Sequence, residues 1–189
     1  MPAILSLHGK GESGTDGLRQ TAIGLGVAIP FNRAEWPFVV VFPQKPTQDC
    51  LWLEHGEFVN EVLAEVESEF APDPTRRYIT GLSQGGRGVF DLAGKLDWRF
   101  AAAAPVCGWT ENSNLAKEFK GIPVWAIHGD ADEVVPISGS VEAVESIVAA
   151  GGDAKLTSLP GVGHNAWDFA YREAGLAEWF LQFQLVDIG

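Results

Sequence analysis

The chain has 189 residues, of which 46% are hydrophobic and 20% are charged, and this length and composition are typical of one globular domain. Acidic residues outnumber basic ones by 25 to 13, for a formal net charge of −12, which disfavours nucleic acid as a partner. The longest apolar runs are far shorter than the roughly 20 residues of a membrane-spanning helix. We therefore expect a single domain over residues 1–189, with no nucleic-acid partner and no membrane span.

The amino terminus lacks the basic segment, apolar core and small-residue cleavage site of a signal peptide, so we expect a cytoplasmic protein. A secreted protein whose leader has been removed would show the same pattern. Cys50 and Cys107 are too few for a disulfide scaffold, and we expect both to be free thiols.

Strand-like runs alternate with helical patterns along the chain. The expected strands are residues 3–7, 39–42, 78–80, 101–106, 124–127 and 155–159. The expected helices are residues 57–70, 141–149 and 166–183, with weaker ones after Gly17 and Gly86. This alternation predicts a parallel sheet with helices on both faces, and in such sheets the chemistry lies in loops at the carboxyl ends of the strands.

The stretch YITGLSQGGRG, residues 78–88, contains the pattern GxSxG with Ser83 at its centre. It lies between an expected strand and an expected helix, as a nucleophile elbow requires. Gly81 and Gly85 fit this sharp turn because side chains there would clash with nearby backbone. We predict that Ser83 is a nucleophile at the positive end of the following helix; the alternative is an ordinary glycine-rich helix start.

A serine nucleophile needs a base, and the base needs an acid that orients it. HGDADEVVP follows the fifth expected strand and GVGHNAWD follows the sixth, so the chain order is Ser83, acid, His164. This is the α/β-hydrolase order of a serine triad. Asp132 is the favoured acid because it lies further into its loop than Asp130, which we expect to accept backbone N–H groups. A surface histidine is the alternative for His164.

The other histidines have simpler interpretations. His8 and His128 each precede a glycine at a strand end and are expected to hold loop backbone, and His55 is expected on the surface at a helix start. His8, His128, His164 and Asp132 could converge on a metal ion, but no spacing matches a zinc or two-metal motif. We therefore expect no metal.

Four stretches in order, LHGKGESG, GLSQGG, HGDADEVVP and GHNAWDFAY, resemble the phospholipase/carboxylesterase-like family of α/β-hydrolases. This family includes acyl-protein thioesterases, small carboxylesterases and feruloyl-esterase-like or peptidase-like enzymes. The resemblance spans residues 5–182 and implies a three-layer α/β-hydrolase sandwich with a mostly parallel sheet of about six strands. It also implies that the first and third strands are neighbours, with the second outside the first. The family normally has two further strands before the first one here, and this sequence departs from the family there.

The resemblance further implies an oxyanion hole formed by the backbone N–H groups of Lys10 and Gln84, and a hydrolysis that needs no cofactor. Lys10 lies in a glycine-rich stretch that first suggests a phosphate-binding loop. The spacing GxxxxGK followed by Ser or Thr is absent there, so nucleotide binding is not expected.

Substrate size is suggested by what lies between the fourth and fifth strands. Only residues 107–121 are there, too few for a helical cap domain, so we expect an open cleft. Trp52 and Trp109 are expected on its rim, in contact with substrate or simply partly buried, and Trp167 is expected to pack the last helix onto the sheet. These features favour a small-molecule substrate, a short-chain acyl or aryl ester. A thioesterase or a peptidase with the same triad is the alternative, and a non-catalytic binding module is the alternative of another class. The oligomeric state has no signature in the sequence.

Overall fold

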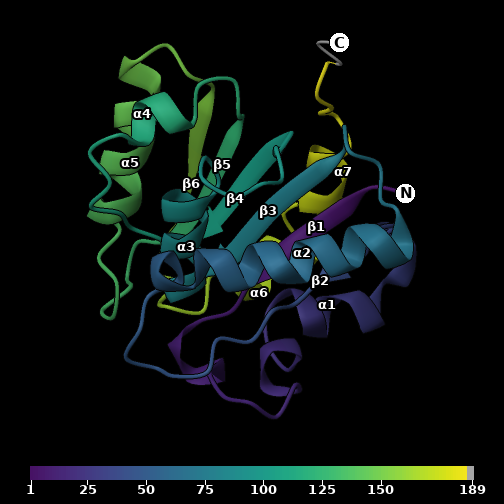
Figure 1. Ribbon diagram of the computed structural model, residues 1–189. Helices are drawn as coiled ribbons and strands as arrows, with labels where there is room; N and C mark the ends of the chain where they lie inside the picture. The colour runs from purple at the N-terminus through teal and green to yellow at the C-terminus, as the bar shows by residue number, and fades with distance from the viewer. Residues whose placement is uncertain (187–189) are drawn as a thin grey trace.

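The computed structural model describes residues 1–186 (Figure 1). Its strands form one sheet in the order β2-β1-β3-β4-β5-β6, and every neighbouring pair is parallel. The strands are β1 (Ala3–Leu7), β2 (Val39–Val41), β3 (Arg77–Leu82), β4 (Ala102–Val106), β5 (Val124–Gly129) and β6 (Ala154–Leu159). The predicted six-stranded parallel sheet is confirmed, with β1 beside β3 and β2 outside β1.

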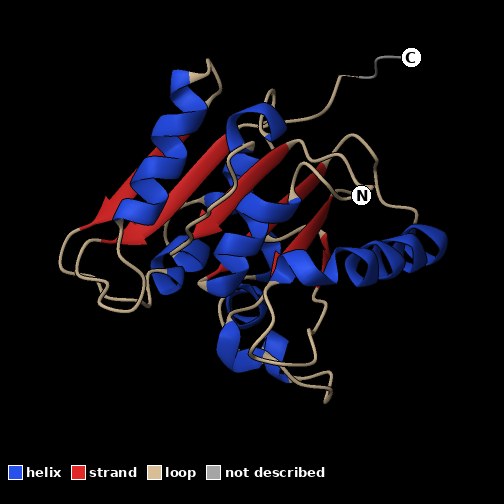
Figure 2. Ribbon diagram, turned by 60° about the vertical axis from the view of Figure 1, so that its left-hand side comes forward, coloured by secondary structure: helices blue, strands red, loops and turns tan. Residues whose placement is uncertain are grey.

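Helices cover both faces of the sheet, so the molecule has three layers (Figure 2). One face carries α2 (Gly56–Phe70), α3 (Gln84–Leu92), α4 (Leu115–Glu118) and α5 (Ser138–Ala149). The other face carries α1 (Leu25–Phe31), α6 (Trp167–Arg172) and α7 (Leu176–Phe180). Figure 1 shows α2 and α3 in front of the strands and α7 behind them.

The alternation of side chains along the strands explains these two layers. Successive residues of a strand point to opposite faces of the sheet. In β1, Leu5 belongs to the buried cluster that contains Val59 and Leu63 of α2, whereas Ile4 belongs to the cluster that contains Leu25 of α1. Each face therefore has its own hydrophobic core, and the sheet is buried between the two.

Two of the predicted helices differ in the structure. The predicted helix over residues 166–183 is two helices, α6 and α7, because Gly175 between them adopts a left-handed conformation with φ of 72°. α3 begins at Gln84, before the predicted start. Residues 107–121 form only the short helix α4 and turns, with no cap domain in the described segment. Within residues 1–186, no helix is long and apolar enough to span a membrane.

Candidate active site

The candidate site lies at the carboxyl ends of the strands. All strands run in the same direction, so the loops that follow them meet at one edge of the sheet. The loops after β1, β3, β5 and β6 contain Lys10, Ser83, Asp132 and His164 respectively. The topology thus gathers residues that are far apart in the sequence.

Ser83 occupies a strained turn between β3 and α3. Its backbone has φ of 55° and ψ of −118°, which a residue with a side chain rarely adopts. A Cβ atom at Gly81 would overlap the carbonyl of Gly85, and one at Gly85 would overlap the carbonyl of Leu7. The two glycines are therefore required by the close approach of backbone, as the elbow pattern predicts.

The three predicted side chains come together in one hydrogen-bonded chain. Ser83 Oγ lies 2.8 Å from His164 Nε2, and His164 Nδ1 lies 2.7 Å from Asp132 Oδ2. The side chain of Asp132 is completely buried, whereas 20% of the His164 side chain is exposed. The imidazole therefore bridges a buried carboxylate and a hydroxyl at the cavity.

Asp132 is held as a carboxylate. Burial alone would raise its pKa, but hydrogen bonds from His164 and from the backbone N–H groups of Val135 and Val134 outweigh burial and lower the pKa. Both backbone groups donate to Oδ1 at 2.9 Å, which leaves Oδ2 for His164. Asp130 accepts the N–H of Gly161 at 2.6 Å, in the bracing role expected of it.

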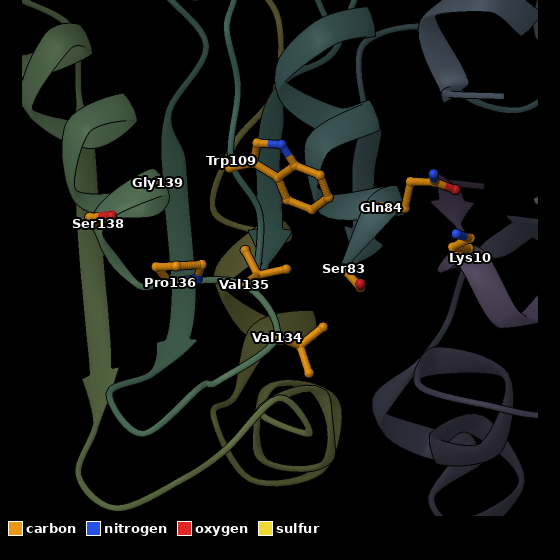
Figure 3. Close-up of a pocket in the computed structure, with 9 residues that line it drawn as sticks. All are labelled: Lys10, Ser83, Gln84, Trp109, Val134, Val135, Pro136, Ser138 and Gly139. Carbon is orange, nitrogen blue, oxygen red and sulfur yellow. The ribbon is translucent and has the colours of Figure 1, made fainter. Parts of the chain in front are cut away.

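The two expected oxyanion donors are each the first residue of a helical segment. Lys10 begins a 3₁₀ helix (Lys10–Glu12) and Gln84 begins α3. The first N–H groups of a helix have no acceptor within it, so they are available to a ligand. Figure 3 shows Lys10 and Gln84 on the same side of Ser83, at one wall of a cavity.

His8 and Trp52 hold the loop that carries Lys10 in place. Burial lowers the pKa of His8 from 6.5 to about 4, so its ring is neutral. Its Nδ1 lies 2.6 Å from the carbonyl of Gly9, and its Nε2 accepts the N–H of Lys45 at 3.1 Å. The Trp52 indole donates to the carbonyl of His8 at 2.9 Å. His8 therefore holds loop backbone, as predicted.

The prediction that Trp52 lies on the rim of the cleft is wrong. Its side chain is only 1% exposed and belongs to the core cluster under α3. The indole packs edge-on against the ring of His8, with 4.8 Å between ring centroids. Trp52 is therefore a support of the Lys10 loop and not a substrate contact.

Sequence reasoning missed Lys45, whose side chain is completely buried. Its ammonium donates to Ser13 Oγ at 2.8 Å and to the carbonyl of Thr47 at 2.5 Å. Ser13 Oγ in turn donates to the carbonyl of Lys10 at 3.0 Å. Burial lowers the pKa of Lys45. The only signal in the sequence is its place in the loop after β2.

A cavity of about 490 Å³ opens beside Ser83. Trp109 lies on its wall, as predicted, and is partly buried. Figure 3 shows Ser83 between Lys10 on one side and Trp109, Val134 and Val135 on the other. The residues that line the cavity are Lys10, Ser83, Gln84, Trp109, Val134, Val135, Pro136, Ser138 and Gly139.

The apolar wall from Val134 to Pro136 was not singled out in the sequence, although it directly follows the acid loop. The volume of the cavity suits a small ligand, because ligand cavities commonly enclose about 300–1,000 Å³. Val134, at the edge of this wall, is 69% exposed.

Residues 57–175 match the model of the Phospholipase/Carboxylesterase family. The chain belongs to this family. Among curated proteins it is similar to "Probable feruloyl esterase C" of Aspergillus niger, with 31% identity over 115 residues, which cover 60% of this chain and 42% of the relative. The chain spans less than half the length of the curated relatives it matches.

Two solved structures have the same fold. A thermostable esterase superimposes with a TM-score of 0.86 and 28% identity, over 97% of this chain and 55% of the other. The esterase PE8 superimposes with a TM-score of 0.68 and 26% identity, over 94% of this chain and 92% of the other. These neighbours agree with the three-layer α/β-hydrolase fold.

Cys50 and Cys107 are free, and Cys107 is buried. Cys107 lies close to other potential metal ligands, next to the carboxylate of Asp132. Atoms of Cys107, His128 and Asp132 lie within 4.8 Å of one another, as metal ligands do. Burial raises the pKa of Cys107 to about 12, so the thiol keeps its proton and donates to the carbonyl of His164 at 3.4 Å. His128 Nε2 lies 3.2 Å from Asp132 Oδ2. The expected lack of a metal stays a prediction.

The burial of Trp167 and of His55 tests two further predictions. Trp167 is partly buried against the core of the α6 face, as expected, and its ring also meets the ring of His164 edge-on at 5.3 Å between centroids. His55 is half-buried at the start of α2 and not fully at the surface.

Proposed function

We propose that the chain is a single-domain serine hydrolase that cleaves carboxylic esters. The observation that carries this proposal is the continuous chain from Ser83 Oγ to His164 to Asp132, with contacts of 2.8 and 2.7 Å. The first distance suits proton transfer from the nucleophile to its base, and the second suits a hydrogen bond from the base to the acid that orients it. Membership of a family of ester hydrolases agrees with the assignment.

The geometry supports a two-step mechanism. His164 Nε2 takes the proton of Ser83 Oγ as that oxygen attacks the ester carbonyl, and Asp132 stabilises the imidazolium that forms. His164 then gives the proton to the departing alcohol, which leaves an acyl-enzyme on Ser83. A water molecule, activated in the same way by His164, hydrolyses the acyl-enzyme and frees the acid. No cofactor is needed.

The backbone N–H groups of Lys10 and Gln84 are proposed to stabilise the oxyanion of each tetrahedral intermediate. Each lies at a helix start beside Ser83 and lacks an acceptor within its helix. One such donor is worth roughly 3 kcal/mol in the transition state.

The cavity favours short-chain acyl or aryl esters. Its wall is formed by Trp109 and the apolar run from Val134 to Pro136, on which a flat or compact acyl group fits. The Aspergillus niger relative is named for a feruloyl ester, whose acyl group contains an aromatic ring. The net charge of −12 argues against strongly anionic substrates.

Two measurements test the proposal. A fluorophosphonate probe should label the protein at Ser83, and Ser83→Ala should abolish the labelling. The values of kcat/KM should be higher for p-nitrophenyl acetate and butyrate and for a feruloyl ester than for p-nitrophenyl decanoate, an acyl thioester or a peptide.

The alternatives give different results. Faster turnover of the thioester or the peptide would assign the same triad to a thioesterase or a peptidase. Folded protein that stays unlabelled and turns over no activated ester would favour a binding module and refute the enzyme.

A further inference from the structure

A second histidine lies against the proposed catalytic acid. The His128 side chain, at the end of β5, is completely buried. Its Nε2 lies 2.9 Å from the carbonyl oxygen of Val135 and 3.2 Å from Asp132 Oδ2. Both oxygens accept hydrogen bonds and neither can donate one, so Nε2 must carry a hydrogen.

The other ring nitrogen of His128 is fixed by Ser140 in α5. Its Nδ1 lies 2.8 Å from Ser140 Oγ, and this hydroxyl also lies 2.9 Å from the carbonyl oxygen of Gly108. Burial lowers the pKa of His128 and outweighs the opposite effects of Val135 and Asp132. The ring is therefore neutral, with its one hydrogen on Nε2. The single hydrogen of the Ser140 hydroxyl can then bond either to the free Nδ1 or to the carbonyl of Gly108, but not to both.

Two imidazoles thus lie against one carboxylate oxygen. Asp132 Oδ2 is 2.7 Å from His164 Nδ1 and 3.2 Å from His128 Nε2. The opposite oxygen, Oδ1, is already occupied by the N–H groups of Val134 and Val135. Three donors therefore hold the carboxylate, namely His164 and the N–H groups of Val134 and Val135. His128 is a further side chain that lies against it, with Nε2 at 3.2 Å from Oδ2.

We propose that His128 is a positioning residue for the Ser83–His164–Asp132 triad: its Nε2–H donates to the carbonyl oxygen of Val135, whose own N–H holds Asp132 Oδ1, and it lies 3.2 Å from Asp132 Oδ2. The proposal rests on the proposed function for its kinetic consequence, but the hydrogen bond itself is a property of the resting protein.

The N–H of His128 has a definite effect on the pH profile. Its partial positive charge, 3.2 Å from Oδ2, offsets part of the negative charge that faces His164, so its loss favours the protonated form of His164. Activity needs neutral His164, and the low-pH midpoint of kcat/KM should then move upward. The titratable groups around His128 are Asp132 in the loop after β5, His164 in the loop after β6 and Cys107 at the end of β4.

The first test uses NMR of protein labelled with ¹⁵N-histidine, which is practical because the chain has four histidines. We expect His128 to show a hydrogen on Nε2 and a bare Nδ1 at neutral pH. The opposite tautomer, with a bare Nε2, would overturn the proposal. This experiment needs no substrate, so its result does not depend on whether the protein is an esterase.

The second test compares three variants in the pH dependence of kcat/KM. His128→Leu removes the donor and should raise the low-pH midpoint by roughly half a pH unit and lower kcat about tenfold. His128→Gln places an amide N–H₂ near the position of Nε2 and should restore most of both. The matched control is Trp125→Phe, which removes a hydrogen bond of 2.8 Å from the same strand to Thr157 without touching Asp132.

The outcomes separate a positioning role from a structural one. Trp125→Phe should reduce the melting temperature and leave the midpoint unchanged. A His128→Leu variant that loses only stability and keeps the wild-type midpoint would overturn the proposal. If His128→Leu does not fold, the NMR tautomer of wild-type His128 decides the proposal: a hydrogen on Nε2 supports it and a bare Nε2 overturns it. An inactive wild type with the expected tautomer would refute the proposed function and leave the placement of His128 against Asp132 intact.

Discussion

The ammonium group of Lys45 lies 2.8 Å from the hydroxyl of Ser13, and the side chain of Lys45 is completely buried. The same hydroxyl lies 3.0 Å from the carbonyl oxygen of Lys10, whose N–H is a proposed oxyanion donor. We expect Lys45→Met to lower kcat about tenfold, because a displaced donor acts less well on the transition state. KM should change little, since the ground state uses this donor less.

A matched control for this change is Lys117→Met, which removes an exposed lysine on α4. It should leave kcat and KM as in the wild type. Steady-state kinetics with p-nitrophenyl butyrate provide the comparison. Equal kcat values for the two variants would show that Lys45 does not support the Lys10 loop.

Two substitutions of Lys10 separate the role of its side chain from that of its main-chain N–H. Lys10→Pro removes the N–H, and the backbone accommodates proline because Lys10 begins a helical segment and Gly9 before it is extended, with ψ of −174°. We expect a folded variant whose kcat is about 100-fold lower.

Lys10→Ala keeps the N–H and should keep most of the activity. Circular dichroism checks that both variants fold, and stopped-flow or steady-state kinetics give kcat. A proline variant as active as the alanine variant would remove Lys10 from the oxyanion hole.

The elbow glycines make a prediction about stability. A Cβ atom at Gly85 would overlap the carbonyl of Leu7, whereas one at Gly163 would meet only the carbonyl of Ala131, at 3.9 Å. Gly85→Ala should therefore lower the free energy of unfolding by about 2 kcal/mol, and Gly163→Ala should change it by about 0.5 kcal/mol or less. Urea unfolding measures both values. Equal stabilities would contradict the close approach of backbone at Gly85.

The main features of this fold follow from local sequence. Strand-like runs of three to six residues separated by amphipathic segments are enough to predict six parallel strands and their helical cover. Ser83, Asp132 and His164 were also predictable, because each follows a strand, and the carboxyl ends of parallel strands must meet. Glycines 81 and 85 mark a turn that only a residue without a side chain tolerates.

Side-chain direction could not be predicted in the same way. Trp52 and Trp109 each follow a strand, yet the first points into the core and the second lines the cavity. Lys45 is a residue type that is rarely buried, and its partners are a serine 32 residues earlier in the chain and a backbone carbonyl. The contact of His128 with Asp132 depends on how the loop after β5 turns back. Such contacts are set by packing between distant segments.

The last prediction concerns acid stability and starts from His8. Burial lowers the pKa of His8 from 6.5 to about 4, so the unfolded chain binds a proton between these values while the folded protein does not. The stabilisation is complete above pH 6.5, is lost as the pH falls toward 4, and changes no further below that. From pH 7 to pH 4.5 the contribution of this one residue amounts to about 2 kcal/mol.

His8→Gln removes the titration and keeps a side-chain oxygen that can accept the N–H of Lys45. Its free energy of unfolding should therefore fall by about 2 kcal/mol less than that of the wild type between pH 7 and pH 4.5. Asp132 and His128 have lowered pKa values as well, and their contributions also decline with falling pH, but they are present in both proteins and cancel in the difference. Urea titrations of both proteins at the two pH values give the four free energies. An equal loss in both would mean that His8 is protonated in the folded protein, and that its Nε2 cannot be the acceptor that holds Lys45 and the loop of Lys10.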